Sequence, residues 1–164
     1  MNIVLIGFMG TGKSSIAPLL ANKLKMESIE MDDLIEKKAG KNIETIFKEN
    51  GEPAFREYEI AVAKDIKDID NKVISTGGGV ILNKIILDYL KTNAKIVGLF
   101  ASFPTILDRI STNIPRPLFQ DKDEAKKLYD FRKPLYESFA DIKVNTDNKS
   151  IAELSQEIAD KITK

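Results

Sequence analysis

The feature that most constrains the fold is a short apolar run followed at once by a glycine-rich loop. The run spans Ile3–Ile6, and the loop that follows it, Gly7–Ser14, reads GFMGTGKS. A continuous apolar run favours a strand that is buried on both faces, as in a parallel sheet. The loop has the pattern G-x4-G-K-[ST], in which glycines turn backbone N–H groups toward phosphate oxygens. The chain is therefore expected to bind a nucleotide at the end of its first strand.

The residues of this loop have separate expected tasks. The side chain of Lys13 reaches the β- and γ-phosphates, and the hydroxyl of Ser14 is placed to ligate Mg²⁺. The helix that follows presents the positive end of its dipole to the same anion. The residues expected to contact the nucleotide here are Gly10, Thr11, Gly12, Lys13, Ser14 and Ser15.

Strand and helix patterns alternate along the rest of the chain. Four more strands are predicted at Ser28–Met31, Lys72–Ser75, Lys95–Phe100 and Asp141–Asn145. Helices are predicted at Ser14–Lys25, Ile43–Lys67, Ile81–Leu90, Phe103–Ser111, Glu124–Phe139 and Ile151–Ile162, with further helical character at Leu34–Glu36. This alternation predicts a single α/β domain over residues 1–164, with a parallel sheet covered by helices on both faces.

Three interruptions are expected within this pattern. Pro18 removes a backbone donor, so we expect a kink or a late start in the first helix, and Pro134 should interrupt a later one. The turn Asn50–Pro53 should break the long helix around it. The polar segment Asn113–Asp123 contains two prolines and is expected to be a mobile surface loop.

Composition excludes several classes of chemistry. The chain has no His and no Cys, so imidazole metal sites, thiolate zinc and thiol catalysis are excluded. Any general base must be a carboxylate or a lysine. The balance of 25 basic and 25 acidic residues argues against broad binding to nucleic acid or membranes. We find no signal peptide pattern and no apolar stretch long enough to span a bilayer, and we expect a cytoplasmic protein.

The phosphate loop alone leaves two classes open. One is a small kinase, and the other is a nucleotide-dependent switch or binding module. A switch usually needs a partner surface or an extra domain, and 164 residues leave little chain for either. A kinase needs a pocket for a second substrate.

Three arginines are candidates for that second pocket. They are Arg56, Arg116 in the polar loop, and Arg132. The planar guanidinium is suited to binding a carboxylate or a phosphate. Taken singly, each arginine is explained as well by pairing with a neighbouring acidic residue, and Arg56 has three glutamates nearby. Only their combination with the phosphate loop favours a substrate site.

Acidic and glycine residues follow the predicted second and third strands. Glu30 and Asp32 end the second strand, and ligands bind at the carboxyl ends of parallel strands. A carboxylate there can take a proton from an acceptor hydroxyl or hold a water of Mg²⁺. We assign this crevice position to Asp32, and we expect Asp33 to cap the next helix. The run Gly77–Gly79 is either a tight turn or a backbone contact to a ligand.

Taken in order, these motifs resemble the shikimate kinase family. They are the phosphate loop, Glu30–Asp32, Gly51–Arg56, Ser75–Gly79, Arg116–Leu118 and Arg132–Tyr136. The resemblance extends from about Ile3 to Asn148. It implies transfer of the ATP γ-phosphoryl group to the 3-hydroxyl of shikimate, a step toward chorismate and the aromatic amino acids. It also implies the fold of nucleoside monophosphate kinases, with a five-stranded sheet in the order 2-3-1-4-5.

The resemblance also implies roles for single residues on the acceptor side. Asp32 matches the aspartate that contacts substrate hydroxyls and acts as the base. Arg56 and Arg132 match the pair that holds the shikimate carboxylate, and Gly78 matches a backbone contact to the substrate. Glu59 would then orient Arg56. The helices at about residues 33–64 correspond to the substrate-binding part of the domain.

On the nucleotide side, the resemblance implies that Lys13 and Arg116 neutralise the charge of the transferring phosphoryl group. Arg116 would lie in a lid at about residues 113–123. Arg109 matches a residue that packs on adenine, Lys149 another nucleotide contact, and Ser14 the Mg²⁺ ligand. The implied ligands are thus ATP, Mg²⁺ and shikimate, with no nucleic acid or membrane partner, and we expect a monomer.

One position departs from the family pattern. Where the family usually has Asp-x-Asp, this chain has Glu30-Met31-Asp32. The first carboxylate normally supports the Mg²⁺ shell through water, and Glu is one methylene longer, so a role of Glu30 near the metal is left open. Kinases of similar fold that act on gluconate or on a nucleotide remain the alternative at this point.

Overall fold

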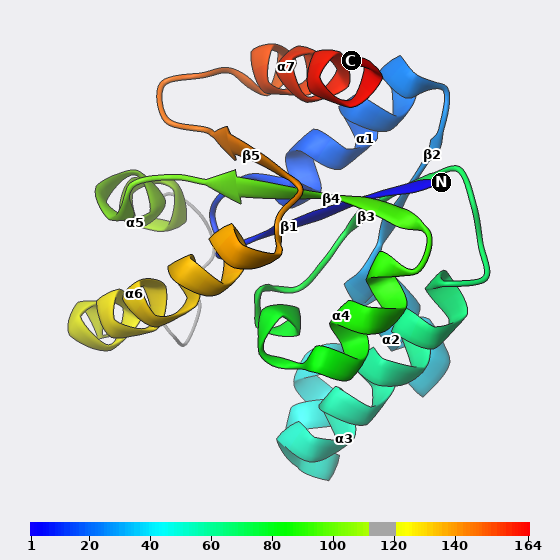
Figure 1. Cartoon of the computed structure of the whole chain (residues 1–164). Helices are drawn as coiled ribbons and strands as arrows, with labels where there is room; N and C mark the ends of the chain where they lie inside the picture. Colours follow the sequence, from blue (N-terminus) through cyan, green and yellow to red (C-terminus); the bar gives the residue numbers. More distant parts are fainter. Residues whose placement is uncertain (112–120) are drawn as a thin grey trace.

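The structure, a computed structural model, describes residues 1–111 and 121–164. Within these residues the strands form one five-stranded sheet in the order β2-β3-β1-β4-β5, and every neighbouring pair is parallel (Figure 1). The strands are β1 (Asn2–Gly7), β2 (Glu27–Glu30), β3 (Lys72–Ser75), β4 (Ala94–Phe100) and β5 (Ile142–Asn145). The predicted fold class and strand order are confirmed.

Strand β1 lies at the centre of this sheet. It pairs with β3 on one side, where Ile3 is opposite Val73, and with β4 on the other, where Asn2 is opposite Ala94. All six of its residues are buried. The apolar run therefore has the doubly buried environment that its sequence predicts.

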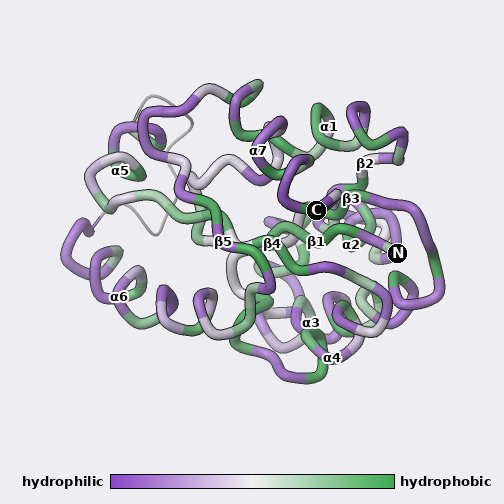
Figure 2. Tube along the Cα trace, turned by 45° about the horizontal axis from the view of Figure 1, so that its top comes forward, coloured by the Kyte–Doolittle hydropathy of each residue, from purple (hydrophilic) through white to green (hydrophobic). Residues whose placement is uncertain are grey.

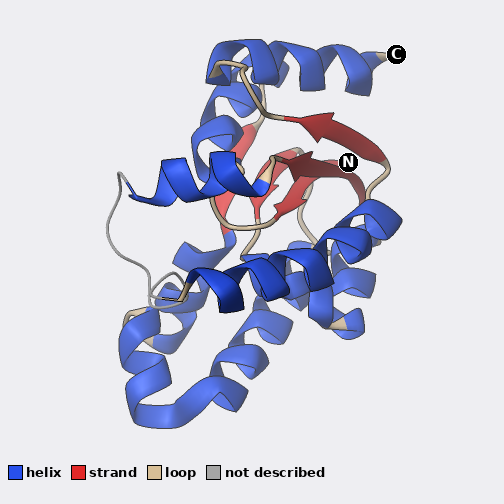
Figure 3. Cartoon of the chain, turned by 90° about the vertical axis from the view of Figure 1, so that its left-hand side faces the viewer, coloured by secondary structure: helices blue, strands red, loops and turns tan. Residues whose placement is uncertain are grey.

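Helices cover both faces of the sheet (Figures 1 and 3). One face is covered by α1 (Lys13–Leu24) and α7 (Ile151–Thr163), which also contact each other. The other face is covered by α2 (Met31–Ala39), α3 (Ile43–Ile66), the short 3-10 helix η1 (Gly78–Leu82), α4 (Lys84–Lys91), α5 (Phe103–Ser111) and α6 (Lys122–Phe139). None of the helices in the described ranges is long and apolar enough to cross a membrane.

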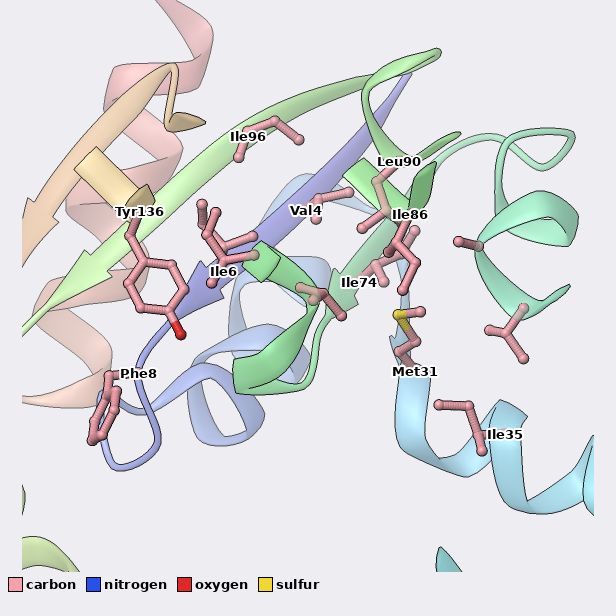
Figure 4. Close-up of a cluster of buried hydrophobic side chains, with 14 of the residues drawn as sticks. Val4, Ile6, Phe8, Met31, Ile35, Ile74, Ile86, Leu90, Ile96 and Tyr136 are labelled. Atoms are coloured by element: carbon pink, nitrogen blue, oxygen red, sulfur yellow. The ribbon is translucent and has the colours of Figure 1, made fainter. Parts of the chain in front are cut away.

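The alternation of side chains along β1 divides the core in two. Ile3 and Leu5 pack into the cluster formed with α1 and α7, whereas Val4 and Ile6 pack into the larger cluster on the other face (Figure 4). Figure 2 shows hydrophobic residues concentrated in the strands and on the inner sides of the surrounding helices. The sheet is thus fixed between two apolar layers. The ends of its strands are not covered by these layers and are available for a ligand site.

The late start expected for the first helix and the interruption expected at Pro134 are wrong. Helix α1 runs unbroken from Lys13 to Leu24 with Pro18 inside it, and α6 likewise contains Pro134. Both prolines are exposed, while the opposite side of α1 is fully buried against the sheet and α7. Tertiary packing of the buried side therefore outweighs the single lost backbone hydrogen bond. The break expected at Asn50–Pro53 is confirmed, because Gly51 has φ 82° inside α3.

Several predicted boundaries also shift. Strand β2 ends at Glu30 and α2 begins at Met31, so Asp32 lies in the first turn of a helix rather than at a strand end. The N-cap residue of α2 is Glu30, and the expected cap at Asp33 is wrong. The predicted helix Ile81–Leu90 is divided into η1 and α4, because the Asn83 side chain accepts from two backbone N–H groups and starts a new helix.

The segment expected as a mobile loop falls mostly outside the described residues. Of Asn113–Asp123, only the last three residues are described. Asp121 caps α6 by accepting from the backbone N–H groups of Asp123 and Glu124, so this helix begins at Lys122, two residues before its predicted start.

Two neighbouring isoleucines of α4 provide a matched test of this packing. Ile86 has an exposed fraction of 0%, whereas Ile85 is 54% exposed. We expect Ile86→Ala to lower the free energy of unfolding by about 2–5 kcal/mol, because it leaves a cavity in the larger cluster. Ile85→Ala should change it by less than about 0.5 kcal/mol. Urea denaturation of both variants measures the difference, and equal effects would contradict the placement of α4.

Candidate active site

A cleft opens where the carboxyl ends of the central strands meet the phosphate loop. Its volume is about 710 Å³, within the usual size of a small-molecule site. It is lined from the loop by Met9–Ser15, from the β2–α2 junction by Glu30 and Asp32, from the end of β3 by Thr76–Gly78, and from α5 and the start of α7 by Arg109, Ile110, Lys149, Ser150, Ile151 and Leu154. This is the position at which parallel sheets bind ligands.

The phosphate loop forms the floor of this cleft. Gly10 and Gly12 have φ values of 82° and 98°, which residues with a Cβ rarely adopt, and Gly12 is the N-cap residue of α1. Lys13 is only 8% exposed, and its ammonium donates to the carbonyl oxygens of Gly7 at 2.6 Å and Phe8 at 3.1 Å. A buried ammonium and the N-terminus of a helix therefore face the same space, as an anion site requires.

Two cationic side chains, those of Arg109 and Lys149, also line the cleft. Arg109 in α5 donates to the carbonyl oxygen of Gly10 and to both the hydroxyl and the carbonyl oxygen of Thr146, each at 3.0 Å. It thereby joins the phosphate loop to the segment after β5. Lys149 in that segment forms an ion pair with Glu157 of α7 at 2.9 Å. Both residues line the cleft, where the sequence expects nucleotide contacts.

The glycine turn after β3 is surrounded by charged side chains. A Cβ built at Gly77 would lie 3.5 Å from Asp32 Oδ1, and one at Gly78 would lie 3.4 Å from Arg132 Nη1. At Gly79 it would lie only 2.8 Å from Arg56 Nη1. Residues from α2, α3 and α6 thus meet at one turn, and a side chain at Gly79 would displace the Arg56 guanidinium from its present position.

Arg56 is held by acidic residues of its own helix. It donates to Glu59 at 2.6 Å and to Glu52 at 3.1 Å. Glu59 is 1% exposed, and burial raises the pKa of its carboxyl group, against the opposing effect of the Arg56 guanidinium. Arg56 therefore does pair with acidic residues of its own helix, which was the alternative explanation for this arginine. The same ion pairs also fix its guanidinium beside the glycine turn.

Arg132 reaches the same turn from α6. Its side chain is 8% exposed, and its Nε has no hydrogen-bond partner among the described residues. A buried guanidinium with an unused donor is costly unless a ligand completes its hydrogen bonds. Two guanidiniums facing a turn rich in backbone N–H groups are suited to the two oxygens of a carboxylate.

The cleft also offers oxygen ligands suited to Mg²⁺. The Ser14 side chain lies on it with the carboxylates of Glu30 and Asp32. Oε1 of Glu30 is buried without a hydrogen-bond partner in the described part of the chain, and burial raises the pKa of this carboxyl group. The described residues contain no group of three or more acidic side chains that could enclose an ion. The donor set fits Mg²⁺, which takes one or two protein ligands together with phosphate oxygens.

The structure brings most of the predicted site residues together. All six loop residues, Asp32, Gly78, Arg109 and Lys149 line the cleft, and Arg56 and Arg132 lie against the glycine turn at its edge. Arg116 lies outside the described residues. Sequence reasoning assigned no role to Tyr136, whose hydroxyl donates to the carbonyl oxygen of Gly78 at 2.6 Å. Tyr136 lies four residues after Arg132 and therefore on the same side of a helix, and this spacing was the signal that could have placed it near the site.

Comparisons with known proteins point to one family. The family model described as shikimate kinase matches residues 9–163. A shikimate kinase of a Sulfurihydrogenibium species is 40% identical over 162 residues, covering 98% of this chain and 97% of the relative. One of Dehalococcoides mccartyi is 42% identical, covering 99% and 94%. The solved shikimate kinase from Acinetobacter baumannii in complex with shikimate has a TM-score of 0.91 at 32% identity, covering 99% of this chain and 92% of that one.

Removal of Arg56 should destabilise the fold in a pH-dependent way. Without the guanidinium, the buried Glu59 carboxyl loses its hydrogen-bonded cation, so its folded-state pKa rises further above the ordinary value of 4.5. Stability is then retained at low pH and lost as the pH rises through that raised pKa. We expect Arg56→Ala to lower the free energy of unfolding by about 3 kcal/mol at pH 8 and by clearly less at pH 5.

The control for this prediction is the double variant Arg56→Ala/Glu59→Gln, in which no carboxyl group remains to titrate. Its stability, measured by urea denaturation, should lose the extra dependence on pH. An equal loss at both pH values in Arg56→Ala would show that Glu59 is not the source.

Proposed function

The chain belongs to the shikimate kinase family, and on that premise we propose how the residues of its cleft carry out the reaction. The reaction transfers the γ-phosphoryl group of ATP to the 3-hydroxyl of shikimate, giving shikimate 3-phosphate and ADP on the way to chorismate. The observation that carries the proposal is the glycine turn, where Asp32, Arg56 and Arg132 converge beside the phosphate loop.

In this proposal the two arginines bind the shikimate carboxylate. Arg56 is oriented by Glu59, and Arg132 places Nη1 beside Gly78 while its Nε has no partner among the described residues. Because they approach the turn from different helices, they can bind the planar carboxylate from two sides. Gly78, which lines the cleft, is proposed to supply a backbone contact to the substrate. The carboxylate subsite thereby fixes the ring and leaves its hydroxyls facing Asp32.

Asp32 is proposed to act as the base. It lies on the cleft between the glycine turn and the phosphate loop, and the chain has no histidine to compete for the role. As the 3-oxygen of shikimate forms its bond to the γ-phosphorus, the carboxylate accepts the hydroxyl proton. The bond between the γ-phosphorus and the bridging oxygen breaks, and ADP leaves with that oxygen.

The loop and its cations are proposed to bind ATP and neutralise charge. Lys13 and the N-terminus of α1 are proposed to bind the phosphates, Arg109 to pack on the adenine and Lys149 to make a further nucleotide contact, and all of them line the cleft. The ion, when bound, would neutralise phosphate charge and be held by Ser14, with Glu30 and Asp32 nearby. Arg116, in a lid at about residues 113–123, is proposed to complete this set, although it lies outside the described residues.

The remaining assignments also stay proposals. We propose one domain over residues 1–164, with residues 33–64 forming the acceptor side, and a monomer whose small-molecule partner is shikimate, without nucleic acid or membrane partners. The cytoplasmic location expected from the sequence stays a prediction.

The first experiment measures Mg²⁺-dependent release of ADP from ATP with and without shikimate. Gluconate serves as the control acid, because it also carries one carboxylate and several hydroxyls. We expect strong stimulation by shikimate, little by gluconate, and loss of activity when EDTA removes the ion. Equal rates with both acids would contradict the proposed acceptor site.

Replacement of Lys13 should separate chemistry from acceptor binding. In Lys13→Ala the charge that acts on the transferring phosphoryl group is lost, so kcat should fall about 10²–10³-fold. The Kd of shikimate, measured by calorimetry without nucleotide, should change little. Unchanged turnover in this variant would contradict the proposed role of the loop.

Replacement of Arg132 should instead act on the KM of the acid. Arg132→Lys keeps the charge but loses the planar fork, and we expect the KM of shikimate to rise about tenfold or more with little change in the KM of ATP. Lys133→Ala is the matched control, since Lys133 is the next residue of α6 and is exposed. A change in the KM of ATP alone would show that the carboxylate assignment is wrong.

A further inference from the structure

A buried tyrosine of α6 joins the glycine turn to Arg132. Tyr136 is 2% exposed and belongs to the same core cluster as Ile6 and Phe8 (Figure 4). Its hydroxyl donates to the carbonyl oxygen of Gly78 at 2.6 Å, across 58 residues of sequence. None of the steps proposed above uses this hydroxyl, although it contacts the turn at which the acceptor is proposed to bind.

Gly78 is enclosed by the two side chains that α6 sends toward it. A Cβ at this position would lie 3.4 Å from Arg132 Nη1, 3.7 Å from the Tyr136 hydroxyl oxygen and 3.9 Å from the carbonyl oxygen of Gly7. Arg132 and Tyr136 are four residues apart and therefore lie one above the other on one side of the helix. The turn, the arginine and the first residue of the phosphate loop are consequently packed around one peptide group.

The tyrosine hydroxyl remains a donor at any working pH. Burial raises the pKa of Tyr136 to about 12, with the charge of Arg132 acting in the opposite direction. The proton is therefore present throughout the neutral range. A carbonyl oxygen has no proton, so the hydrogen bond has one fixed direction, from the phenol to Gly78.

We propose that Tyr136 is a positioning residue for the acceptor carboxylate. Its hydrogen bond holds the Gly77–Gly79 turn at a fixed distance from α6, so that Gly78 and Arg132 bind the carboxylate together. This inference rests on the proposed carboxylate site. The physical reason is that Gly77–Gly79, at the start of η1, has no side chains of its own that could fix its position by packing. Because a peptide group is planar, a fixed carbonyl at Gly78 also fixes the direction of the Gly79 N–H group.

The same helix offers a matched control. Tyr129 is also buried, and its hydroxyl donates to a backbone carbonyl oxygen, that of Ala101 at 2.7 Å. The two phenols thus form equivalent hydrogen bonds two turns apart. They differ in what they hold, since Ala101 follows strand β4 and Gly78 lies in the glycine turn. Loss of either hydroxyl should cost similar stability, and only one loss should affect the acceptor.

The experiment compares Tyr136→Phe with Tyr129→Phe in the steady-state assay. For Tyr136→Phe we expect the KM of shikimate, and its Kd measured without nucleotide, to rise about tenfold, the effect of one modest hydrogen bond. The kcat and the KM of ATP should change less than twofold. For Tyr129→Phe the KM of shikimate should change less than twofold, while both variants lose about 2–4 °C in Tm.

A double variant tests whether Tyr136 acts through the carboxylate subsite. In the Arg132→Lys background, Tyr136→Phe should raise the KM of shikimate by less than it does in the unmodified chain, because both changes weaken one unit. Additive effects would overturn the inference. So would an equal KM of shikimate in Tyr136→Phe and Tyr129→Phe. The rise in Tm caused by saturating shikimate gives the same comparison if a variant is too unstable for kinetics.

The outcomes also separate this inference from the proposed function. If Arg132→Lys raises the KM of shikimate and Tyr136→Phe does not, the positioning role is wrong and the carboxylate site stands. If neither variant changes it, or if shikimate does not stimulate ADP release, the proposed site and the role of Tyr136 fail together.

Discussion

Strand β1 is buried on both faces, and the positions of the other elements follow from this burial. Its side chains alternate between the cluster under α1 and α7 and the cluster under the remaining helices. The strand is also paired on both edges, with β3 on one side and β4 on the other. The phosphate loop leaves from its carboxyl end, which places the anion site at the centre of the sheet edge, within reach of residues from both neighbouring strands.

The acceptor side depends on a second feature, the meeting of three charged side chains at the glycine turn after β3. Gly77–Gly79 admits Asp32 from α2, Arg56 from α3 and Arg132 from α6 to within contact distance of one short segment. These side chains carry opposite charges in a partly buried place, where electrostatic effects are stronger than in water. Glu59 and Tyr136 hold parts of this arrangement and lie behind the surface that a substrate would meet.

Local patterns were sufficient for some elements and insufficient for others. The buried strand, the phosphate loop and the break at Gly51 follow from short stretches of sequence, because apolar runs and glycines act where they stand. The late helix start expected from Pro18 was wrong, since the buried side of α1 holds the helix together. The division of Ile81–Leu90 also escaped prediction, because it depends on the cap that Asn83 forms. Propensity describes the isolated segment, and packing acts on the assembled one.

The sequence by itself determined the family, through it the sheet order, and the identity of many residues around the cleft, because motifs preserve residue type and order along the chain. Only the tertiary structure decided how those residues are held. That Arg109 joins the loop to Thr146 and that Tyr136 reaches Gly78 are relations between segments far apart in sequence. No spacing rule specifies such contacts, since they arise when separate elements pack against one sheet and their side chains share the same buried space.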